Sequence, residues 1–396
     1  MARALRVNHL RVVHIIQSYL PLGGGAERLV ATLASPLRRQ DVEIVVVTRR
    51  YPGLAPFESI DGVPVYRLPI PRPKPIAALS FTLTALPLLR RLQPDVIHAH
   101  ELLSPSTIAI VAKRLLGGIP VVAMPHRGGY LGDIDKLQTR SLGKQRLSLL
   151  RRHVDAFVTI SREIDAELDG VGIPPRQRVP IPNGVDTRRF EPLPAEAKQM
   201  LRRQLDLPQA PIAIFAGRLV AEKCIDLLIG VWPAVRTAHA DACLLLLGTG
   251  PQEGALRQAA SAGIRFTGRV EDVAPFLQAA DLFVLPSATE GLSVALLEAM
   301  AAGLAPVATA VGGTPDLIEH GQNGWLIPVG DPAALQNAII ALLGDRQRRQ
   351  QMGRRGRQQI VRDYALPVVA QRLRTLYDQL IAGQFATASR PLGSIP

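Results

Sequence analysis

Two glutamates with seven residues between them, Glu290 and Glu298, form the most unusual charged pair of this chain. They lie in the stretch ATEGLSVALLEAMAAGLAPVATAVGG, residues 288–313, where Glu298 is the only charged residue between Gly291 and Pro315. A carboxylate placed among apolar residues loses its hydration, which is costly unless other polar groups replace the water. We therefore expect Glu298 to be buried and to accept hydrogen bonds from a ligand, such as the hydroxyl groups of a ribose.

A helix is expected to begin just after Glu290 and to contain Glu298. Its first backbone N–H groups, which have no partner within a helix, suit a phosphate, and we expect them to come from Leu292, Ser293 and Val294. At 3.6 residues per turn, Glu298 lies two turns further along the same groove. The alternative interpretation is that Glu290 only complements the helix dipole and that Glu298 faces solvent.

A pair of cations, Arg218 and Lys223, stands five residues apart in FAGRLVAEKCIDLLI, where a strand is expected to pass into a helix. Two cations there suit a diphosphate, because the guanidinium binds in a bidentate way and the ammonium acts as a point charge. Taken alone, the pair is equally compatible with a solvated surface loop. Together with the two glutamates at the same edge of the sheet, it favours a nucleoside diphosphate ligand.

Glycines and histidines occupy the corresponding positions of the first half. LPLGGGAERLV has three consecutive glycines, which let a backbone approach a phosphate closely. They lack the spacing of a dinucleotide-binding fingerprint. The alternative interpretation is that they only form the turn between a strand and a helix. His98 and His100 end one expected strand, and His126 follows the next. A structural role is the commoner one for a histidine after a strand.

The pair Asp133 and Asp135, in GDID, is similar to a metal-binding Asp-x-Asp motif. Because it follows glycines and does not end a strand, we expect a solvated loop and no metal ion.

Alternating short β-branched runs and helical stretches must position these residues. Strands are expected at 12–16, 43–48, 95–98, 120–123 and 156–160, and again at 212–216, 242–247, 265–267, 282–285 and 306–309, with a long helix at 136–153 and a helical end from 332 to 381. This pattern predicts an α/β protein with two doubly wound, Rossmann-like domains that face a central cleft. We expect a first domain at 1–190, a second domain at 191–365, a helix at 366–383 that packs back on the first domain, and a flexible tail at 384–396.

Excess positive charge is concentrated in the first half of the sequence. Up to Val185 there are 25 lysines and arginines and 14 acidic residues, whereas from Asp186 onward there are 21 lysines and arginines and 19 acidic residues. A basic first half suits binding to anionic lipid head groups or to a phosphorylated acceptor. Nucleic acid is not expected as a partner, since the basic stretches lack interleaved aromatic residues.

A basic amphipathic stretch at 136–154, with leucines expected to form a packed stripe, can lie on an anionic membrane or simply face solvent. Two cysteines and the absence of an export-like N-terminal segment predict a cytoplasmic protein, with peripheral membrane contact as an alternative.

Several motifs together resemble glycosyltransferase family 4, whose members are retaining enzymes of the two-Rossmann glycosyltransferase fold, GT-B. They are GRLVAEK, the two spaced glutamates, FTGRVEDVAPFLQAADLFVLPS, GGTPDLIEHGQNGWLIPVGD and IPNGVDTRRFEP, and the similarity covers nearly the whole chain. The resemblance implies that Glu298 contacts the donor ribose and Glu290 the transferred sugar. It implies that Arg218 and Lys223 bind the diphosphate and that backbone near Val270 meets the base.

In the first half, the resemblance assigns the family's Gly-Gly-x-Glu motif to residues 24–27. Gly25 would face the diphosphate, and Gly24 and Glu27 the acceptor side. His126 resembles the family's histidine near the transferred sugar, so we favour it over His98 and His100 as a catalytic residue. One departure is Cys224, where the family usually has glycine after the lysine.

The expected function is therefore metal-independent transfer of a sugar from a nucleoside diphosphate sugar (UDP, GDP or ADP) to an acceptor hydroxyl, with retention of configuration and without a cofactor. The acceptor is expected to be a sugar or a lipid-linked molecule in the synthesis of a cell-surface polysaccharide or glycolipid. Two alternatives remain open from the sequence: a nucleotide-sugar epimerase on the same fold, and a non-catalytic sugar or lipid binder.

Overall fold

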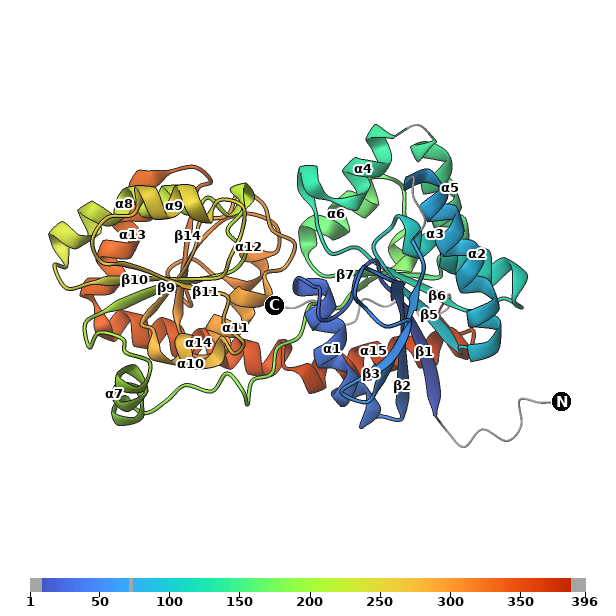
Figure 1. Ribbon diagram of the computed structural model, residues 1–396, viewed down its shortest axis with the longest axis horizontal. Helices are drawn as coiled ribbons and strands as arrows, with labels where there is room; N and C mark the ends of the chain where they lie inside the picture. The colour runs from blue at the N-terminus through green and yellow to red at the C-terminus, as the bar shows by residue number, and fades with distance from the viewer. Residues whose placement is uncertain (1–8, 71–73, 141, 386–396) are drawn as a thin grey trace. The chain divides into compact units, whose positions relative to one another are not determined.

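The structure is a computed structural model of the 396-residue chain that describes residues 9–70, 74–140 and 142–385. Most of the expected tail, residues 386–396, lies outside this description. Two compact units divide the chain: unit 1 comprises Met1–Asn183 with Leu366–Pro396, and unit 2 comprises Gly184–Ala365. Figure 1 shows that each unit has its own sheet with helices on both faces.

Unit 1 is built on an eight-stranded sheet in which every neighbouring pair is parallel except β3 and β4. In spatial order the strands are β3 (Phe57–Ile60), β4 (Val63–Leu68), β2 (Val42–Arg49), β1 (Leu10–Ile15), β5 (Val96–His100), β6 (Val121–Met124), β7 (Ala156–Thr159) and β8 (Arg178–Pro180). Its helices are α1 (Gly25–Arg38), α2 (Lys74–Leu92), α3 (Ser104–Leu115), α4 (Asp133–Thr139), α5 (Gly143–His153), α6 (Arg162–Gly170) and α15 (Leu366–Ile381). The C-terminal helix α15 packs against α1, within unit 1.

Unit 2 is built on a six-stranded, fully parallel sheet. Its spatial order is β11 (Ile264–Gly268), β10 (Cys243–Leu247), β9 (Ile212–Ala216), β12 (Leu282–Leu285), β13 (Ala305–Thr309) and β14 (Trp325–Ile327). Its helices are α7 (Ala195–Gln204), α8 (Ile225–Ala238), α9 (Glu253–Ala259), α10 (Ala274–Ala279), α11 (Val294–Ala301), α12 (Thr314–Leu317), α13 (Pro332–Gly344) and α14 (Arg346–Asp363).

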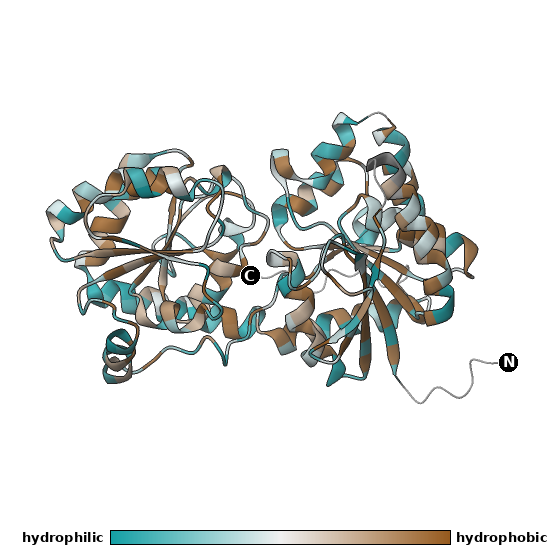
Figure 2. Ribbon diagram, viewed as in Figure 1, coloured by the Kyte–Doolittle hydropathy of each residue, from teal (hydrophilic) through white to brown (hydrophobic). Residues whose placement is uncertain are grey.

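Apolar runs explain why these strands form the centre of each unit. The residues of β9, β10, β12 and β13 are all buried, as expected for parallel strands covered by helices on both faces. Figure 2 shows the same contrast, with hydrophobic strands inside and hydrophilic residues on the outer sides of the helices. The predicted α/β class with two doubly wound domains therefore matches the observed architecture.

The long helix expected at 136–153 is wrong, because the segment forms two helices, α4 and α5. Leu142 adopts a left-handed φ of 67° between them. A Cβ on Gly143 would lie 1.5 Å from the carbonyl oxygen of Leu137, so the two helices meet where only glycine fits. The predicted leucine stripe is interrupted there too, since Leu142 is exposed.

A second difference concerns the segment 57–68, where the sequence predicted no strand. It contains the short strands β3 and β4, whose antiparallel pairing extends the sheet beyond β2.

The strand orders place a topological switch point in each unit. In unit 2 the chain runs outward from β9 through β10 to β11 and then returns to place β12 on the other side of β9. In unit 1 the same reversal separates β1 from β5. Ligands of open α/β sheets bind outside the carboxyl ends of the strands at such points, so we expect a ligand to contact the loops after β9, β12, β1 and β5.

Candidate functional site

The switch point of unit 2 brings together two predicted site residues from distant parts of the chain. Lys223 follows β9 and Glu290 follows β12, and Lys223 Nζ lies 2.5 Å from Glu290 Oε1. Only 8% of the Glu290 side chain and 19% of the Lys223 side chain are exposed. The loops at this edge therefore hold an ion pair at the position where an open α/β sheet binds its ligand.

Neighbouring groups hold the Glu290 loop in place. Ser287, which is fully buried, donates a hydrogen bond to Glu290 Oε1 at 2.6 Å, and Thr309 donates to the Ser287 carbonyl oxygen at 2.5 Å. Gly312 has φ +56°, and a Cβ there would lie 2.2 Å from the Glu290 carbonyl oxygen. Ser287 and Gly312 were not predicted as site residues, although both follow predicted strands.

Helix α11 corrects part of the expectation for the phosphate. The helix begins at Val294, and Ser293 is its N-cap, accepting a hydrogen bond from Leu296 N at 3.3 Å. Leu292 therefore precedes the helix, and it already takes part in an interaction within the protein. A phosphate at this helix would meet the first turn, from Val294 onward, and not an N–H group of Leu292 within the helix.

Glu298 lies in the middle of α11 and differs from the expectation in its surroundings. The side chain is half-buried and not deeply buried, and it already has an interaction within the chain. The apolar sequence around it reflects the buried face of α11, whose residues Leu296, Leu297 and Met300 are fully enclosed. An unsatisfied buried carboxylate is thus not what marks Glu298.

The other predicted donor residues lie on loops at the same edge of the sheet. Arg218 follows β9; 59% of its side chain is exposed, and its guanidinium is 3.7 Å from Glu222. Val270 is half-buried and follows β11. Their assigned contacts with the diphosphate and the base remain predictions.

The loop after β10, which was not predicted as part of the site, closely approaches the loop after β9 that carries Arg218. Gly248 has φ +129°, and a Cβ there would lie 1.9 Å from the carbonyl oxygen of Gly217. A Cβ on Gly250 would lie 2.2 Å from the Leu219 carbonyl oxygen. The two glycines of the GTG sequence after β10 therefore allow the backbones of the loops after β9 and β10 to pack directly against each other.

In unit 1, Gly24 and Gly25 stand where α1 begins, after β1. Both glycines are exposed, and Gly25 is the first helical residue. Glu27 accepts hydrogen bonds from Ser18 Oγ at 2.5 Å and from Gly24 N at 2.8 Å, so it ties the glycine loop to the helix. Its contact with an acceptor stays a prediction beside this structural role.

Four histidines gather at the switch point of unit 1, one more than the sequence analysis considered. His14 is on β1, His98 and His100 are on β5, and half-buried His126 follows β6. Burial lowers the pKa of His14 to about 3 and that of His126 to about 4, with Arg127 contributing to the latter. Burial also lowers the pKa of His98 and of His100 well below the ordinary value, so all four are neutral near pH 7.

Two acids lie beside these histidines. Glu101 follows His100 with φ +79° and accepts a hydrogen bond from Gln17 at 2.7 Å. Asp133 accepts one from Leu102 N at 2.7 Å and is buried in the first turn of α4, so the expectation of a solvated loop is wrong. Burial raises the pKa of both carboxyl groups.

His14, His98 and His100 are close enough together to be considered as metal ligands. Both ring nitrogens of His100 are already engaged, one with His14 and one with His126. A metal ion would have to displace at least one of these hydrogen bonds, since a nitrogen that shares a proton cannot also donate its lone pair to a metal. We therefore assign no metal to this cluster.

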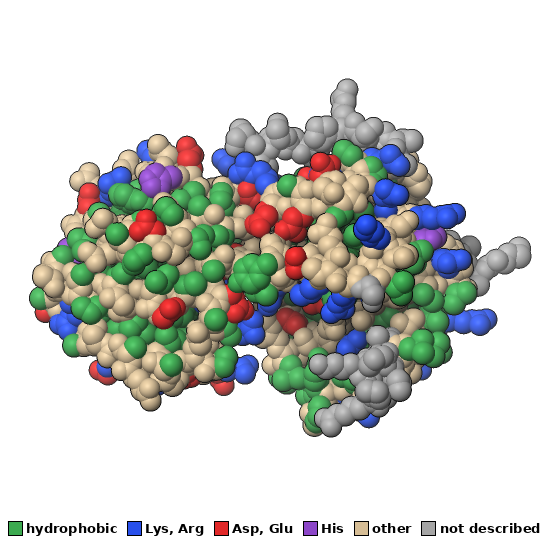
Figure 3. All heavy atoms as spheres, turned by 90° about the horizontal axis from the view of Figure 1, so that it is seen from above, with side chains coloured by type: hydrophobic (Ala, Val, Ile, Leu, Met, Phe, Trp, Pro, Cys, Tyr) green, Lys and Arg blue, Asp and Glu red, His purple; other side chains and the backbone are tan. Residues whose placement is uncertain are grey.

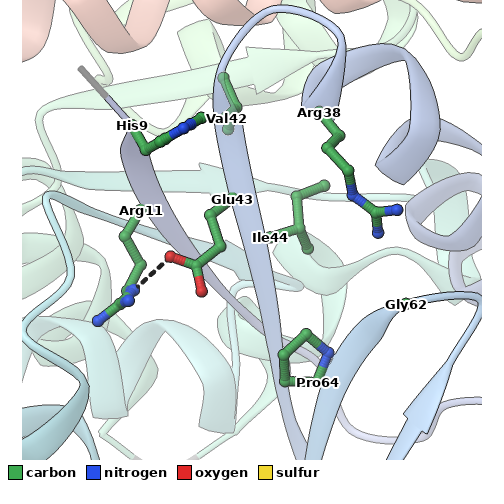
Figure 4. Close-up of a pocket in the computed structure, with 8 residues that line it drawn as sticks. All are labelled: His9, Arg11, Arg38, Val42, Glu43, Ile44, Gly62 and Pro64. Carbon is green, nitrogen blue, oxygen red and sulfur yellow. Dashed lines mark hydrogen bonds and ion pairs between the residues drawn. The ribbon is translucent and has the colours of Figure 1, made fainter. Parts of the chain in front are cut away.

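A pocket of about 510 Å³ lies elsewhere in unit 1, as Figure 4 shows. Its lining comes from the starts of β1, β2 and β4 and from the end of α1, and it includes the Arg11–Glu43 ion pair, 2.7 Å long. This is the amino edge of the sheet, opposite to the edge that binds ligands in open α/β folds. None of the predicted site residues lines this pocket.

The surface of unit 1 carries many basic side chains, as Figure 3 shows for one face. On α5, Lys144, Arg151 and Arg152 are exposed together with Leu149. Arg146 instead donates a hydrogen bond to Thr107 at 2.8 Å. None of the helices in the described ranges combines the length and apolarity that a bilayer crossing requires.

Comparison with known proteins agrees with this architecture. The family model described as Glycosyltransferase Family 4 matches residues 23–189, and that described as Glycosyl transferases group 1 matches residues 210–345. The chain is 30% identical over 353 residues to a GDP-mannose-dependent alpha-mannosyltransferase of Mycobacterium tuberculosis, covering 86% of this chain and 89% of that protein.

A second relative is a GDP-mannose-dependent monoacylated alpha-(1-6)-phosphatidylinositol monomannoside mannosyltransferase of Corynebacterium glutamicum. It is 35% identical over 206 residues, and the alignment spans about half of each protein, 49% of this chain and 54% of the relative.

Among solved structures, a sucrose-phosphate synthase from Thermosynechococcus elongatus superposes with a TM-score of 0.80 at 22% identity, over 95% of this chain and 100% of that chain. This likeness confirms the predicted GT-B fold. The two family models cover both halves of the sequence, and the mycobacterial relative matches across them. The chain belongs to glycosyltransferase family 4.

Proposed function

We propose that the protein transfers mannose from GDP-mannose to a hydroxyl group of a phosphate-bearing glycolipid, with retention of the anomeric configuration. The observation that carries the site assignment is the Lys223–Glu290 pair at the switch point of unit 2. Both relatives described above are named as GDP-mannose-dependent enzymes, which supports the choice of donor. Neither is named as an epimerase, so sugar transfer is favoured over that alternative.

In this proposal the charged groups of unit 2 act on the leaving group. The bond between the anomeric carbon and the β-phosphate oxygen breaks, and its electron pair leaves with GDP. Lys223, Arg218 and the first turn of α11 stabilise the negative charge that grows on the diphosphate. No metal ion is proposed for this role.

The remaining residues orient the reactants. Lys223 exchanges its contact with Glu290 for the diphosphate, which frees the carboxylate of Glu290 to accept a hydrogen bond from a sugar hydroxyl. Glu298 accepts hydrogen bonds from the ribose. The acceptor hydroxyl bonds to the anomeric carbon on the face that the diphosphate leaves, and its proton passes to the departing phosphate.

The donor is tested by thermal shift with GDP-mannose, UDP-glucose and ADP-glucose. A ligand that binds only the folded state at 100 times its Kd stabilises it by about 2.7 kcal/mol, so we expect GDP-mannose to raise Tm by a few degrees. The other two donors should change Tm little. Equal shifts with all three, or a shift with UDP-glucose alone, would contradict the choice of donor.

The basic surface of α5 is proposed to hold the enzyme at an anionic membrane, where a glycolipid acceptor resides. Each Lys or Arg near such a surface contributes about 1 kcal/mol, and the attraction weakens with salt. We expect the protein to sediment with phosphatidylglycerol-containing vesicles at low salt and not with phosphatidylcholine vesicles.

Two charge-reversed variants distinguish the effect of the basic surface of α5 on membrane binding from the effect of the protein's net charge. Lys144→Glu with Arg152→Glu should abolish sedimentation, whereas Arg346→Glu with Arg354→Glu, an equal charge change at exposed positions of α14, should not. If both variants bind as the wild type does, α5 is not the membrane contact.

A further inference from the structure

His14, His100 and His126 of unit 1 form a hydrogen-bonded chain. His14 Nδ1 lies 2.8 Å from His100 Nε2, and His100 Nδ1 lies 2.9 Å from His126 Nε2. In both pairs the ring centroids are 5.1 Å apart, and the planes are inclined by 21° and 11°. The rings therefore lie nearly in one plane, joined edge to edge through their nitrogens.

The sheet dictates this arrangement. His14 on β1 and His98 on β5 are register partners, and His100 lies two residues further on the same face of β5. His126 follows β6, the next strand. The chain thus begins inside the sheet and ends at its carboxyl edge, with His126 as the outermost ring.

Because all three rings are neutral near pH 7, each has one N–H donor and one nitrogen acceptor. His100 must then donate to one neighbour and accept from the other. The two hydrogen bonds point in the same direction along the chain, and the state of one end determines the state of the other.

The inner end decides the direction. His14 Nε2 is buried and has no hydrogen-bond partner among the described residues. A proton there would be a buried N–H without an acceptor, which is rarer in proteins than an unpaired buried acceptor. The proton of His14 is therefore on Nδ1, and it is donated to His100 Nε2. His100 then carries its own proton on Nδ1 and donates it to His126 Nε2.

We propose that His14 and His100 are positioning residues that hold His126 in its Nδ1–H tautomer, so that His126 presents an N–H donor to a hydroxyl group of the bound sugar. The interaction with a sugar rests on the function proposed above, whereas the tautomer does not. In this state His126 orients the sugar as a hydrogen-bond donor and is not a general base.

His98 provides a matched control within the same cluster. It is as buried as His14 and His100, with 1% of each residue exposed, and it lies on the same face of the sheet. Its Nδ1, however, lies 2.8 Å from the hydroxyl oxygen of Tyr377 on α15, and no hydrogen bond links it to the chain that ends at His126. Replacing His98 disturbs the packing equally but leaves that chain intact.

The test is NMR of the full-length protein labelled with ¹⁵N in its histidine rings, at pH 7.5 without ligand. Two-bond ¹H–¹⁵N correlations distinguish a protonated from an unprotonated ring nitrogen, and His126→Gln assigns the resonances. We expect His126 to have a protonated Nδ1 and an unprotonated Nε2. Protonation of Nε2 in the wild type would overturn the proposal.

Variants test the origin of the tautomer. His100→Leu removes the donor to His126 Nε2, so His126 should change to the Nε2–H tautomer. His100→Asn keeps a side-chain N–H near the position of Nδ1 and should retain the wild-type tautomer, as should His98→Leu. If His98→Leu shifts the tautomer as His100→Leu does, the effect is one of packing and the assignment to His100 is wrong.

Kinetics with GDP-mannose then test the role. We expect His100→Leu to lower kcat about 10- to 100-fold with little change in donor Kd, a loss typical of residues that orient a functional group, and His100→Asn to recover most of it. An unchanged kcat in His100→Leu would overturn the positioning role. A protein that shows the Nδ1–H tautomer but transfers no sugar from any donor would refute the proposed function and leave the tautomer assignment standing.

Discussion

Replacing Lys223 by alanine should lower kcat/KM for the donor by about 100- to 1,000-fold, the range observed when one preorganised electrostatic group is removed. The change removes a cation from the proposed diphosphate site, and it leaves the carboxylate of Glu290, which is 8% exposed, with the Ser287 hydroxyl in place of its ion pair. Donor affinity from isothermal titration and initial rates of transfer would measure the two effects separately.

Lys198 offers a matched control for this experiment. It forms a 2.8 Å ion pair with Asp281, and the two side chains are 24% and 18% exposed. Asp281 also accepts a hydrogen bond from Ile212 N, which places this pair at the amino edge of the same sheet. Lys198→Ala should therefore reduce the Tm of unit 2 without weakening donor binding. Equal losses of donor affinity in the two variants would show that Lys223 acts through stability alone.

Acidification should destabilise unit 1 steeply as the pH falls below about 6.5. Four histidines are neutral in the folded protein because burial lowers their pKa, to about 3 for His14 and about 4 for His126. In the unfolded chain each has a pKa near 6.5 and takes up a proton that the folded state rejects. Each histidine therefore contributes stability that is fully present above about pH 6.5 and declines below it, by up to about 1.4 kcal/mol per pH unit.

Three carboxyl groups of the same unit act in the opposite direction. The pKa of Glu101, of Asp133 and of Glu167 is raised by burial, so the folded state keeps these protons to higher pH than the unfolded state does. Their protonation stabilises the folded state on the acid side and lowers the net slope. With four histidines against three acids, stability should still fall between pH 6.5 and 4.5.

Both tryptophans, Trp232 and Trp325, lie in unit 2, which allows the units to be followed separately. Urea melts at a series of pH values should show that circular dichroism, which reports both units, shifts to lower urea more than tryptophan fluorescence does. His98→Phe, which removes one titrating ring, should make the pH dependence shallower. A free energy of unfolding for unit 1 that does not change between pH 7 and pH 5 would contradict the expectation.

The sequence predicted that Lys223 and Glu290 lie at the same edge of the sheet, but it did not predict the ion pair between them. Both residues follow apolar runs that were recognised as strands, so their placement at the carboxyl edge could be predicted. Which strands are neighbours depends on the return of the chain from β11 to β12, and short apolar runs do not encode that order.

His14, in contrast, could not be recognised from the sequence as part of the site. It is flanked by apolar residues in a strand and has no motif around it, so nothing in its immediate sequence distinguishes it from a core residue. Its importance follows from the pairing of β1 with β5, which sets it beside His98 and His100. The helix break at Leu142 was missed for a related reason, since the close approach of Gly143 to Leu137 depends on packing and not on helical periodicity.

Glu298 was correctly placed in a helix at this edge, but the reason for singling it out was wrong. The apolar residues around it belong to the buried face of α11, and the glutamate is on the half-buried face. A run of apolar residues in a helix says which face is enclosed; it does not say that every residue in the run is enclosed.

In the mechanism proposed above, the pairing of Lys223 with Glu290 also discriminates between ligands. Without a donor the lysine has its own counter-ion, so an incoming anion must compete with a carboxylate that is already in contact. Inorganic phosphate can replace the carboxylate but supplies no hydroxyl group for it, whereas a nucleotide sugar offers a phosphate to the lysine and a hydroxyl to the released carboxylate. We therefore expect the proposed site to exclude abundant small anions and to admit a ligand that satisfies both partners at once.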